Sequence, residues 1–154
     1  MYVFDNSPIS RLHRSFYRSR FPTLWAQFDE LIVDGTIIST REVRRELEQY
    51  SRIEDGWLRD NGYIFTTPTA AEAEFIAQIY RVEHFQQNIE LKKIQKGGLN
   101  ADPFVIAKAA TEERTVVTLE SEPPNGAKIP NICRHFDIPC IGLEEFMEVE
   151  NWEF

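Results

Sequence analysis

The sequence lacks the features that mark membrane, secreted and nucleotide-binding proteins. Its apolar runs are all shorter than the roughly 20 residues that cross a bilayer, and Met1 is not followed by a basic segment and an apolar one. Only two cysteines occur, Cys133 and Cys140, so we expect reduced thiols rather than a disulfide framework. No glycine-rich phosphate loop is present. These absences predict a cytoplasmic protein that makes no contact with a membrane.

Basic residues are also scarce. The chain carries 17 lysines and arginines against 25 aspartates and glutamates, a formal net charge of -8. Binding of nucleic acid by bulk electrostatics requires clustered lysine and arginine, so the overall charge argues against it. The balance is uneven, because residues 11–20 contain four arginines and no acid. Such a run is either a local patch for phosphates or a solvated helix face.

What the chain does contain is one alternating pattern of strands and helices. Its 154 residues, 42% hydrophobic, suffice for one core, so we expect a single domain over residues 1–154. Strands are predicted at 2–4, 37–38, 63–65, 115–119 and 140–141. Helices are predicted at 9–18, 22–33, 40–50, 69–96 with a bend near 84–88, from 102 onward, 131–136 and 143–149. The pattern predicts an α/β fold of three layers, with a mainly parallel sheet of about four to five strands flanked by helices.

Local signals define some of these helices further. Ser39 with Glu42, and Thr69 with Glu72, have the spacing of capping boxes at helix starts. In the second part of the long helical region, Leu91 and Ile94 form the apolar stripe that is expected to face inward.

Acidic residues fall where an open parallel sheet gathers its ligands, outside the carboxyl ends of the strands. Asp5 follows the first strand, Glu120 follows the strand at 115–119, and Asp102 opens the buried helix before that strand. Carboxylates that converge with no intervening lysine or arginine repel one another unless a cation lies between them. Oxygen ligands alone favour a hard ion such as Mg²⁺ or Mn²⁺.

Each of these acids has a simpler interpretation. Asp102 before Pro103 is a good helix cap, and Asp5 fits the start of a turn before Pro8. Glu120 is alternatively a solvated loop acid, with Glu122 as a rival two residues away.

A fourth acid comes from the helix at 40–50. Glu42 and Glu46 lie one turn apart, so position alone does not choose between them. The capping box accounts for Glu42, which leaves Glu46, beside the inward Val43 and Leu47, as the better candidate.

Four motifs follow one another along the chain: the strand 2–5 followed by Asn6-Ser7, the helix segment 42–47, the segment 100–107 and the strand 116–120. In this order they resemble a PIN domain, and more narrowly the PIN-like DUF4411 family. Residues 128–133 and the closing Cys140-Ile141 are also similar to that family, so the resemblance covers nearly the whole chain.

The resemblance implies a metal-dependent ribonuclease with an acidic pocket for Mg²⁺ or Mn²⁺. Asp5, Glu46 and Asp102 match the family's acids, and Glu120 matches a fourth position at which many PIN domains have aspartate. The longer side chain at 120 puts two-metal catalysis in doubt. Ser7 and Thr118 match polar positions that support the pocket. The resemblance further implies the toxin of a toxin–antitoxin pair, held inactive by a small antitoxin protein and often a homodimer.

The mechanism predicted from these residues is metal-assisted hydrolysis of RNA, with Arg41, Arg44 and Arg45 as candidates to position the RNA backbone. Two alternatives remain open. One is an α/β phosphohydrolase of small phosphate esters, for which Lys108 is the available lysine. The other is a catalytically silent PIN-like module that binds a partner protein, which the net charge and Glu120 favour.

Overall fold

The structure, a computed structural model, describes residues 1–154 apart from the side chain of Tyr50. Its strands are β1 (Tyr2–Phe4), β2 (Ile37–Thr40), β3 (Phe65–Thr66), β4 (Thr115–Val117) and β5 (Cys140–Ile141). Its helices are α1 (Asn6–Ser15), α2 (Pro22–Val33), α3 (Arg41–Tyr50), α4 (Trp57–Asp60), α5 (Ala70–Arg81), α6 (Gln87–Lys96), α7 (Asp102–Glu112), α8 (Ile129–His135) and α9 (Leu143–Val149), with 3-10 turns η1 (Gly62–Ile64) and η2 (Glu83–Gln86). Within the described residues, no helix has the length and hydropathy of a membrane span.

The strands form one parallel sheet in the order β3-β2-β1-β4-β5, which confirms the predicted sheet. β1 is central, with Val3 opposite Ile38 of β2 and Val116 of β4. The chain builds β2 and β3 on one side of β1 and then crosses to the other side for β4 and β5. The sheet therefore reverses its winding between β1 and β4, and ligands of open α/β sheets bind at such a point.

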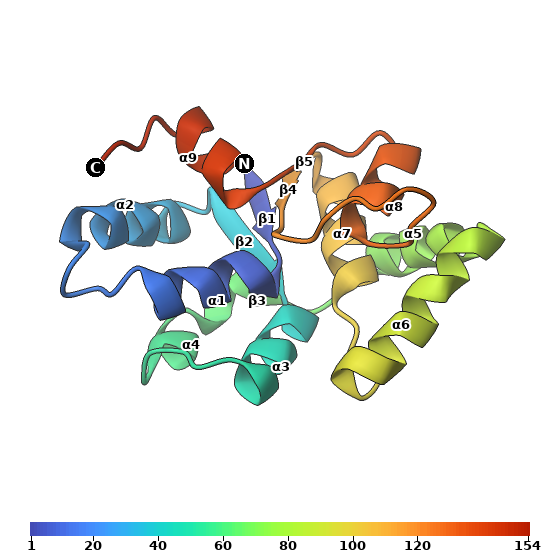
Figure 1. Cartoon of the computed structure of the whole chain (residues 1–154), viewed down its shortest axis with the longest axis horizontal. Helices are drawn as coiled ribbons and strands as arrows, with labels where there is room; N and C mark the ends of the chain where they lie inside the picture. The colour runs from blue at the N-terminus through green and yellow to red at the C-terminus, as the bar shows by residue number, and fades with distance from the viewer.

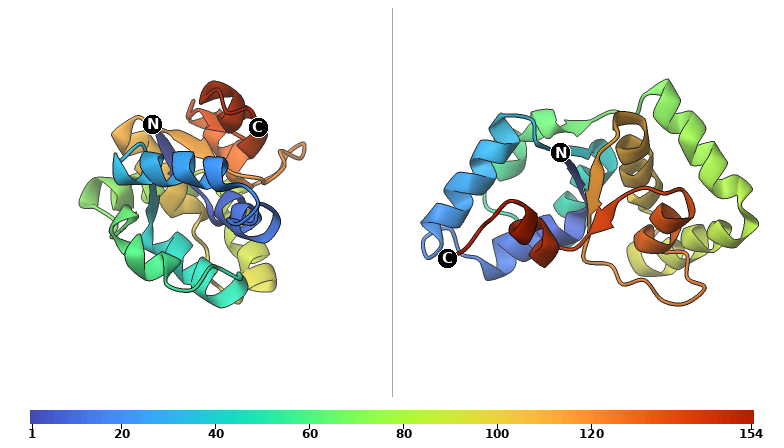
Figure 2. Two further views of the ribbon diagram at one scale, coloured as in Figure 1. Left: turned by 90° about the vertical axis from the view of Figure 1, so that its left-hand side faces the viewer. Right: turned by 90° about the horizontal axis from the view of Figure 1, so that it is seen from above.

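Helices cover both faces of the sheet, as the views in Figures 1 and 2 show. On one face, Tyr2 and Phe4 pack edge-to-face against Phe146 of α9, and Phe4 also contacts Phe28 of α2. Val3 alternates with them and faces the other side, where α7 packs on β1, β2 and β4 with α5 behind it. Burial of each large apolar side chain in these two layers contributes roughly 1.5–3 kcal/mol to the free energy of folding. The three-layer prediction is confirmed.

The start of α3 differs from the prediction. Ser39 still belongs to β2, and its hydroxyl donates to the Phe4 carbonyl at 2.6 Å. Thr40 caps the helix instead, since its Oγ1 accepts from the Val43 amide at 3.3 Å. The predicted capping box of Ser39 and Glu42 is therefore wrong, and Glu42 has no role in capping. The box of Thr69 and Glu72 is confirmed at the start of α5.

The predicted strand at 63–65 lies too early in the chain. Residues 62–64 form the turn η1, and the pairing with β2 begins at Phe65, opposite Ser39. The short helix α4 was not predicted. It starts after Gly56, whose φ of 79° places it in the left-handed region that glycine adopts without strain.

The break between α5 and α6 at η2 agrees with the predicted bend, but the inward face of α6 does not. Ile94, predicted to face inward, is 85% exposed, and Leu91 is half-buried. The buried side chains of α6 are Asn88 and Lys92. This helix turns a polar face to the protein because that face meets the carboxylates of the site.

Candidate functional site

Four carboxylates meet beside the carboxyl ends of β1 and β4. Asp5 directly follows β1, Glu120 lies three residues beyond β4, Asp102 is the first residue of α7, and Glu46 projects from α3. We call Asp5, Glu46, Asp102 and Glu120 the acid cluster. The structure brings together all four acids that the sequence singled out, at the point where the sheet reverses its winding.

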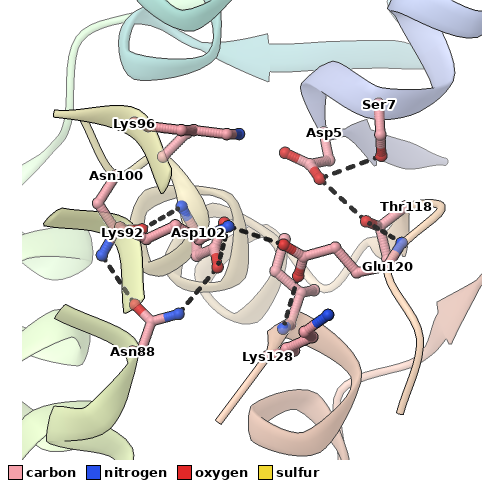
Figure 3. A network of polar contacts seen from close by, with 12 residues as sticks. Asp5, Ser7, Asn88, Lys92, Lys96, Asn100, Asp102, Thr118, Glu120 and Lys128 are labelled. Carbon is pink, nitrogen blue, oxygen red and sulfur yellow. Dashed lines mark hydrogen bonds and ion pairs between the residues drawn. The ribbon is translucent and has the colours of Figure 1, made fainter. Parts of the chain in front are cut away.

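Asp5 is held by hydroxyl groups on one oxygen only (Figure 3). Its Oδ2 accepts from Thr118 Oγ1 at 2.9 Å and from Ser7 Oγ at 3.4 Å. Both hydroxyls are fixed in turn, because Ser7 Oγ accepts from the Leu119 amide and Thr118 Oγ1 from the Glu120 amide. Asp5 Oδ1 is buried and has no hydrogen-bond partner among the described residues. An acceptor of this kind is costly to bury, so it indicates a position for a proton or a cation.

Asp102 is bound by an asparagine of α6. Asn88 Nδ2 donates to Asp102 Oδ2 at 2.8 Å and to the Ala127 carbonyl at 3.0 Å, while Asn88 Oδ1 accepts from Asn100 Nδ2 at 2.8 Å. Asp102 does not cap α7 with its side chain, since the N-cap position belongs to Ala101. Local sequence favoured the cap for this residue, and the tertiary contact with α6 decides otherwise.

Lysines lie between the carboxylates, contrary to the expectation that none would intervene. Lys92 Nζ is 2.9 Å from Glu120 Oε1 and 3.3 Å from Asp102 Oδ2, and its side chain is 4% exposed. Lys96 Nζ lies 3.1 Å from Glu46 Oε1. Asn88, Lys92 and Lys96 recur every four residues, which places them on one face of α6. That spacing was the available signal for these residues, and the apolar stripe at Leu91 and Ile94 obscured it.

Glu46 and Glu120 are each anchored by a backbone amide as well. Glu46 Oε2 accepts from the Ala101 amide at 3.2 Å, and its Oε1 also accepts from Asn6 Nδ2. Glu120 Oε2 accepts from the Ile129 amide at 3.0 Å, at the start of α8. These contacts orient both glutamates toward the cluster and distinguish them from neighbouring surface acids.

Burial and mutual repulsion raise the pKa values of the two aspartates. Burial raises the pKa of Asp5 to about 6, with further contributions from the charges of Glu120 and Glu46. Burial also raises the pKa of Asp102 to about 8, and Glu120 adds to this while Lys92 opposes it. For Lys92 itself, burial disfavours the charge, but the carboxylates of Asp102 and Glu120 outweigh burial and raise its pKa above the ordinary value.

Several residues considered from the sequence lie outside the acid cluster. Glu122, the rival of Glu120, is ion-paired with Arg134. Lys108, the lysine of the phosphohydrolase alternative, contacts Glu72 at 3.4 Å and Glu112 at 2.9 Å. Lys108 therefore pairs with acids outside the cluster, and the lysines that the structure places beside the cluster are Lys92 and Lys96.

Cys133 and Cys140 are free thiols, as expected.

The three arginines predicted to position RNA lie in two environments. Arg41 and Arg45 line a cavity to which α3 and α7 contribute, whereas Arg44 pairs with Glu48 at 3.0 Å along α3.

The acid cluster offers oxygen ligands and an excess of negative charge. Four carboxylates face the ammonium groups of Lys92 and Lys96, which leaves two negative charges uncompensated when all these groups are ionised. As they stand, the described side chains include no group of three or more His, Cys, Asp or Glu residues arranged to hold a metal ion. The donor chemistry and the charge excess still match one hard divalent cation, with Asp5 Oδ1 as its free ligand atom.

Comparison with known proteins gives one match. The family described as "Domain of unknown function (DUF4411)" matches residues 2–154. Searches of curated proteins and of solved structures found no match.

Proposed function

Because the chain belongs to the DUF4411 family, as its motifs indicated, we propose that the acid cluster is the active site of a divalent-metal-dependent endoribonuclease. The observation that carries the proposal is Asp5 Oδ1, a buried acceptor without a partner among the described residues, within a cluster whose carboxylates outnumber its lysines. The resemblance of the four motifs to PIN domains adds the substrate class, which is RNA.

Asp5, Asp102 and Glu120 would hold one Mg²⁺ or Mn²⁺ ion, with Glu46 as a direct or water-mediated ligand. When bound, the ion would act as a Lewis acid that activates water and neutralises charge on the phosphate under attack. The longer side chain of Glu120 and the ammonium group of Lys92 beside it both favour one ion over two.

The protein's own groups prepare this site before substrate arrives. Thr118 and Ser7 orient Asp5, and Asn88 orients Asp102, so the ligand oxygens keep fixed directions. Lys92 and Lys96 supply positive charge beside the acids, where a phosphodiester would otherwise be repelled. No histidine is required for this chemistry.

The biological setting is also part of the proposal. Resemblance to PIN-like toxins supports a cytoplasmic toxin of a toxin–antitoxin system, bound by a small antitoxin protein, and a homodimer. These partners rest on that resemblance alone.

A second candidate is a catalytically silent PIN-like module that binds a partner protein. Lys92 favours it, because an ammonium group 2.9 Å from Glu120 and 3.3 Å from Asp102 neutralises these acids without a metal. In that case the cluster is a structural ion-pair network.

Cleavage of a mixed RNA panel in Mn²⁺, Mg²⁺ or chelator separates the two candidates. Asp5→Asn and Asp102→Asn should each abolish metal-dependent cutting, whereas Glu122→Gln, which changes an acid outside the cluster, should leave it intact. Absence of cutting by the folded parent protein in either metal would favour the silent module.

A further inference from the structure

A basic pocket lies between α1 and the segment that follows α3, away from the acid cluster. Its volume is about 490 Å³, within the range of roughly 300–1,000 Å³ that small-ligand sites occupy. The described residues that line it are polar or basic: Ser10, His13, Arg14, Ser51 and Arg52. No acid is among them, although the whole chain has a formal net charge of -8. A concave site of positive charge in an acidic protein indicates an anionic ligand.

The two arginines of this pocket have charges that other side chains leave uncompensated. Arg14 and Arg52 are exposed, and neither forms an ion pair or a side-chain hydrogen bond with the described residues. By contrast, Arg18, the next arginine after Arg14, pairs with Asp29 at 2.8 Å and with Glu54 at 2.9 Å. A guanidinium group without a carboxylate partner can bind a phosphate through two parallel N–H donors.

Contacts with α1 hold Arg52 in place. Ser51 directly follows α3, and its Oγ lies 2.7 Å from Ser10 Oγ. Two residues beyond Arg52, the Glu54 amide donates to His13 Nδ1 at 3.3 Å. Burial lowers the pKa of His13 to about 4, so the ring is neutral at pH 7 and can accept this hydrogen bond. The backbone on both sides of Arg52 is thus fixed to α1, which reduces the entropy that ligand binding would cost.

The serine pair adds a neutral donor to the pocket. In the contact between Ser10 Oγ and Ser51 Oγ, one hydroxyl donates and the other accepts. Each hydroxyl has one hydrogen, so the accepting hydroxyl can still donate to a ligand while the pair stays intact. Guanidinium and hydroxyl groups are among those that proteins use to bind phosphate oxygens of nucleic acids.

Two helices, α1 and α3, connect the pocket to the acid cluster and pack against each other (Figure 1). At the cluster they are joined by Asn6, whose Nδ2 donates to Glu46, and at the pocket by the contact between Ser10 and Ser51. Asn6, Ser10 and Arg14 recur every four residues on one face of α1, so Arg14 lies about 12 Å along the helix axis from Asn6. An RNA strand with one phosphate at the acid cluster can therefore place a neighbouring phosphate at the pocket.

We propose that this pocket binds a backbone phosphate of the RNA substrate near the scissile one, with Arg14 and Arg52 as charged donors and the serine pair as a further donor. The inference rests on the proposed nuclease function. A phosphate contact fixes the position of the strand and carries no base preference. An acidic segment of a partner protein would offer carboxylates to the same arginines, but the connection to the acid cluster along α1 favours the RNA strand.

Binding of a labelled single-stranded RNA oligonucleotide in chelator tests the pocket without requiring catalysis. Arg14→Gln combined with Arg52→Gln should weaken binding about tenfold at low salt, whatever the RNA sequence. The slope of log K against log salt concentration should fall in magnitude by about 0.7, the value for one phosphate of a single strand. Arg11→Gln combined with Arg20→Gln is the matched control, because it removes the same charge from exposed arginines outside the pocket, and it should bind RNA like the parent.

Neutral methylphosphonate linkages, placed one at a time along the oligonucleotide, identify the phosphate that the pocket binds. The parent should lose affinity at one particular linkage. The variant with Arg14→Gln and Arg52→Gln should lose none there, because the changes in protein and in RNA remove the same contact.

A double variant that binds RNA like the parent, or that loses as much affinity as the parent at every linkage, would overturn the proposal. A polyglutamate peptide is the probe for the other class of ligand. If that peptide bound the parent but not the double variant, and RNA affinity stayed the same, the pocket would be a site for an acidic partner protein and the RNA assignment would be wrong. Pocket-dependent RNA binding by a protein that cuts no RNA in Mn²⁺ or Mg²⁺ would refute the nuclease function and leave the phosphate site in place.

Discussion

The ammonium group of Lys92 lies between two carboxylates, 2.9 Å from Glu120 and 3.3 Å from Asp102. It belongs to α6, a helix whose buried face is polar, so the acid cluster has a counterion from its own chain. A divalent ion at Asp102 and Glu120 would compete with this ammonium group for the same oxygen atoms. On the proposed function, Lys92 would therefore link metal binding to the stability of the metal-free protein.

Lys92→Met should destabilise the metal-free protein and strengthen metal binding. Removal of one partner from a buried ion pair costs about 3–5 kcal/mol, because the remaining charges lose their counterion. We expect a lower Tm in chelator and a larger rise in Tm with Mn²⁺ than the parent shows. Lys93→Met, at an exposed neighbour, is the control and should match the parent. If Mn²⁺ shifted the Tm of Lys92→Met and the parent equally, competition at these oxygens would be disproved.

Stability of the metal-free protein should fall as pH rises from about 4 to about 8. Native Asp5 and Asp102 have raised pKa values, about 6 and about 8, so the folded chain holds protons that the unfolded chain, whose aspartates titrate near 3.9, releases. Asp102→Asn cannot ionise, and we expect it to flatten the decline between about pH 6 and pH 8. Urea unfolding at several pH values in chelator measures the pH dependence of the free energy of unfolding. Asp55→Asn, at an exposed acid, should keep the parent's slope, and an unchanged slope in Asp102→Asn would contradict the assignment.

Asn88→Ala should destabilise the protein by about 3 kcal/mol, since it leaves several buried groups unpaired. The Asn88 amide donates to Asp102 and to the Ala127 carbonyl, and it accepts from Asn100 and Tyr80. Urea unfolding of this variant and of Gln95→Ala, an exposed change on α6, gives the comparison. If Asn88→Ala lost no more stability than Gln95→Ala, the hydrogen bonds of Asn88 would contribute little to the free energy of folding.

Thr118→Val should reduce RNA cleavage by about tenfold while the fold is retained, because Asp5 loses its closer hydroxyl donor. Thr118→Ser keeps the hydroxyl and should retain most of the activity. The ratio of the two rates at saturating Mn²⁺, with the Mn²⁺ affinity of each variant, distinguishes orientation of Asp5 from general damage. Equal rates for valine and serine would rule out this role for Thr118.

The order of the elements was predictable because it depends on local patterns. Buried strands such as β1 and β4 are short runs of apolar residues, and α5 begins with the capping box of Thr69 and Glu72. The errors arose where a tertiary contact overrides a local preference. Ser39 has the spacing of a cap, but its hydroxyl donates to Phe4 on the neighbouring strand.

The sequence by itself predicted the parallel α/β fold and singled out four acids as site residues: Asp5, Glu46, Asp102 and Glu120. It could do so because strand ends and helix periodicity are properties of short segments. Only the tertiary structure decided which groups compensate the negative charges of these acids. The lysine beside Asp102 comes from α6, and the unpaired oxygen of Asp5 becomes evident only when the elements around it are assembled. Charge compensation and burial depend on groups distant in sequence, and no local pattern specifies which of them will meet.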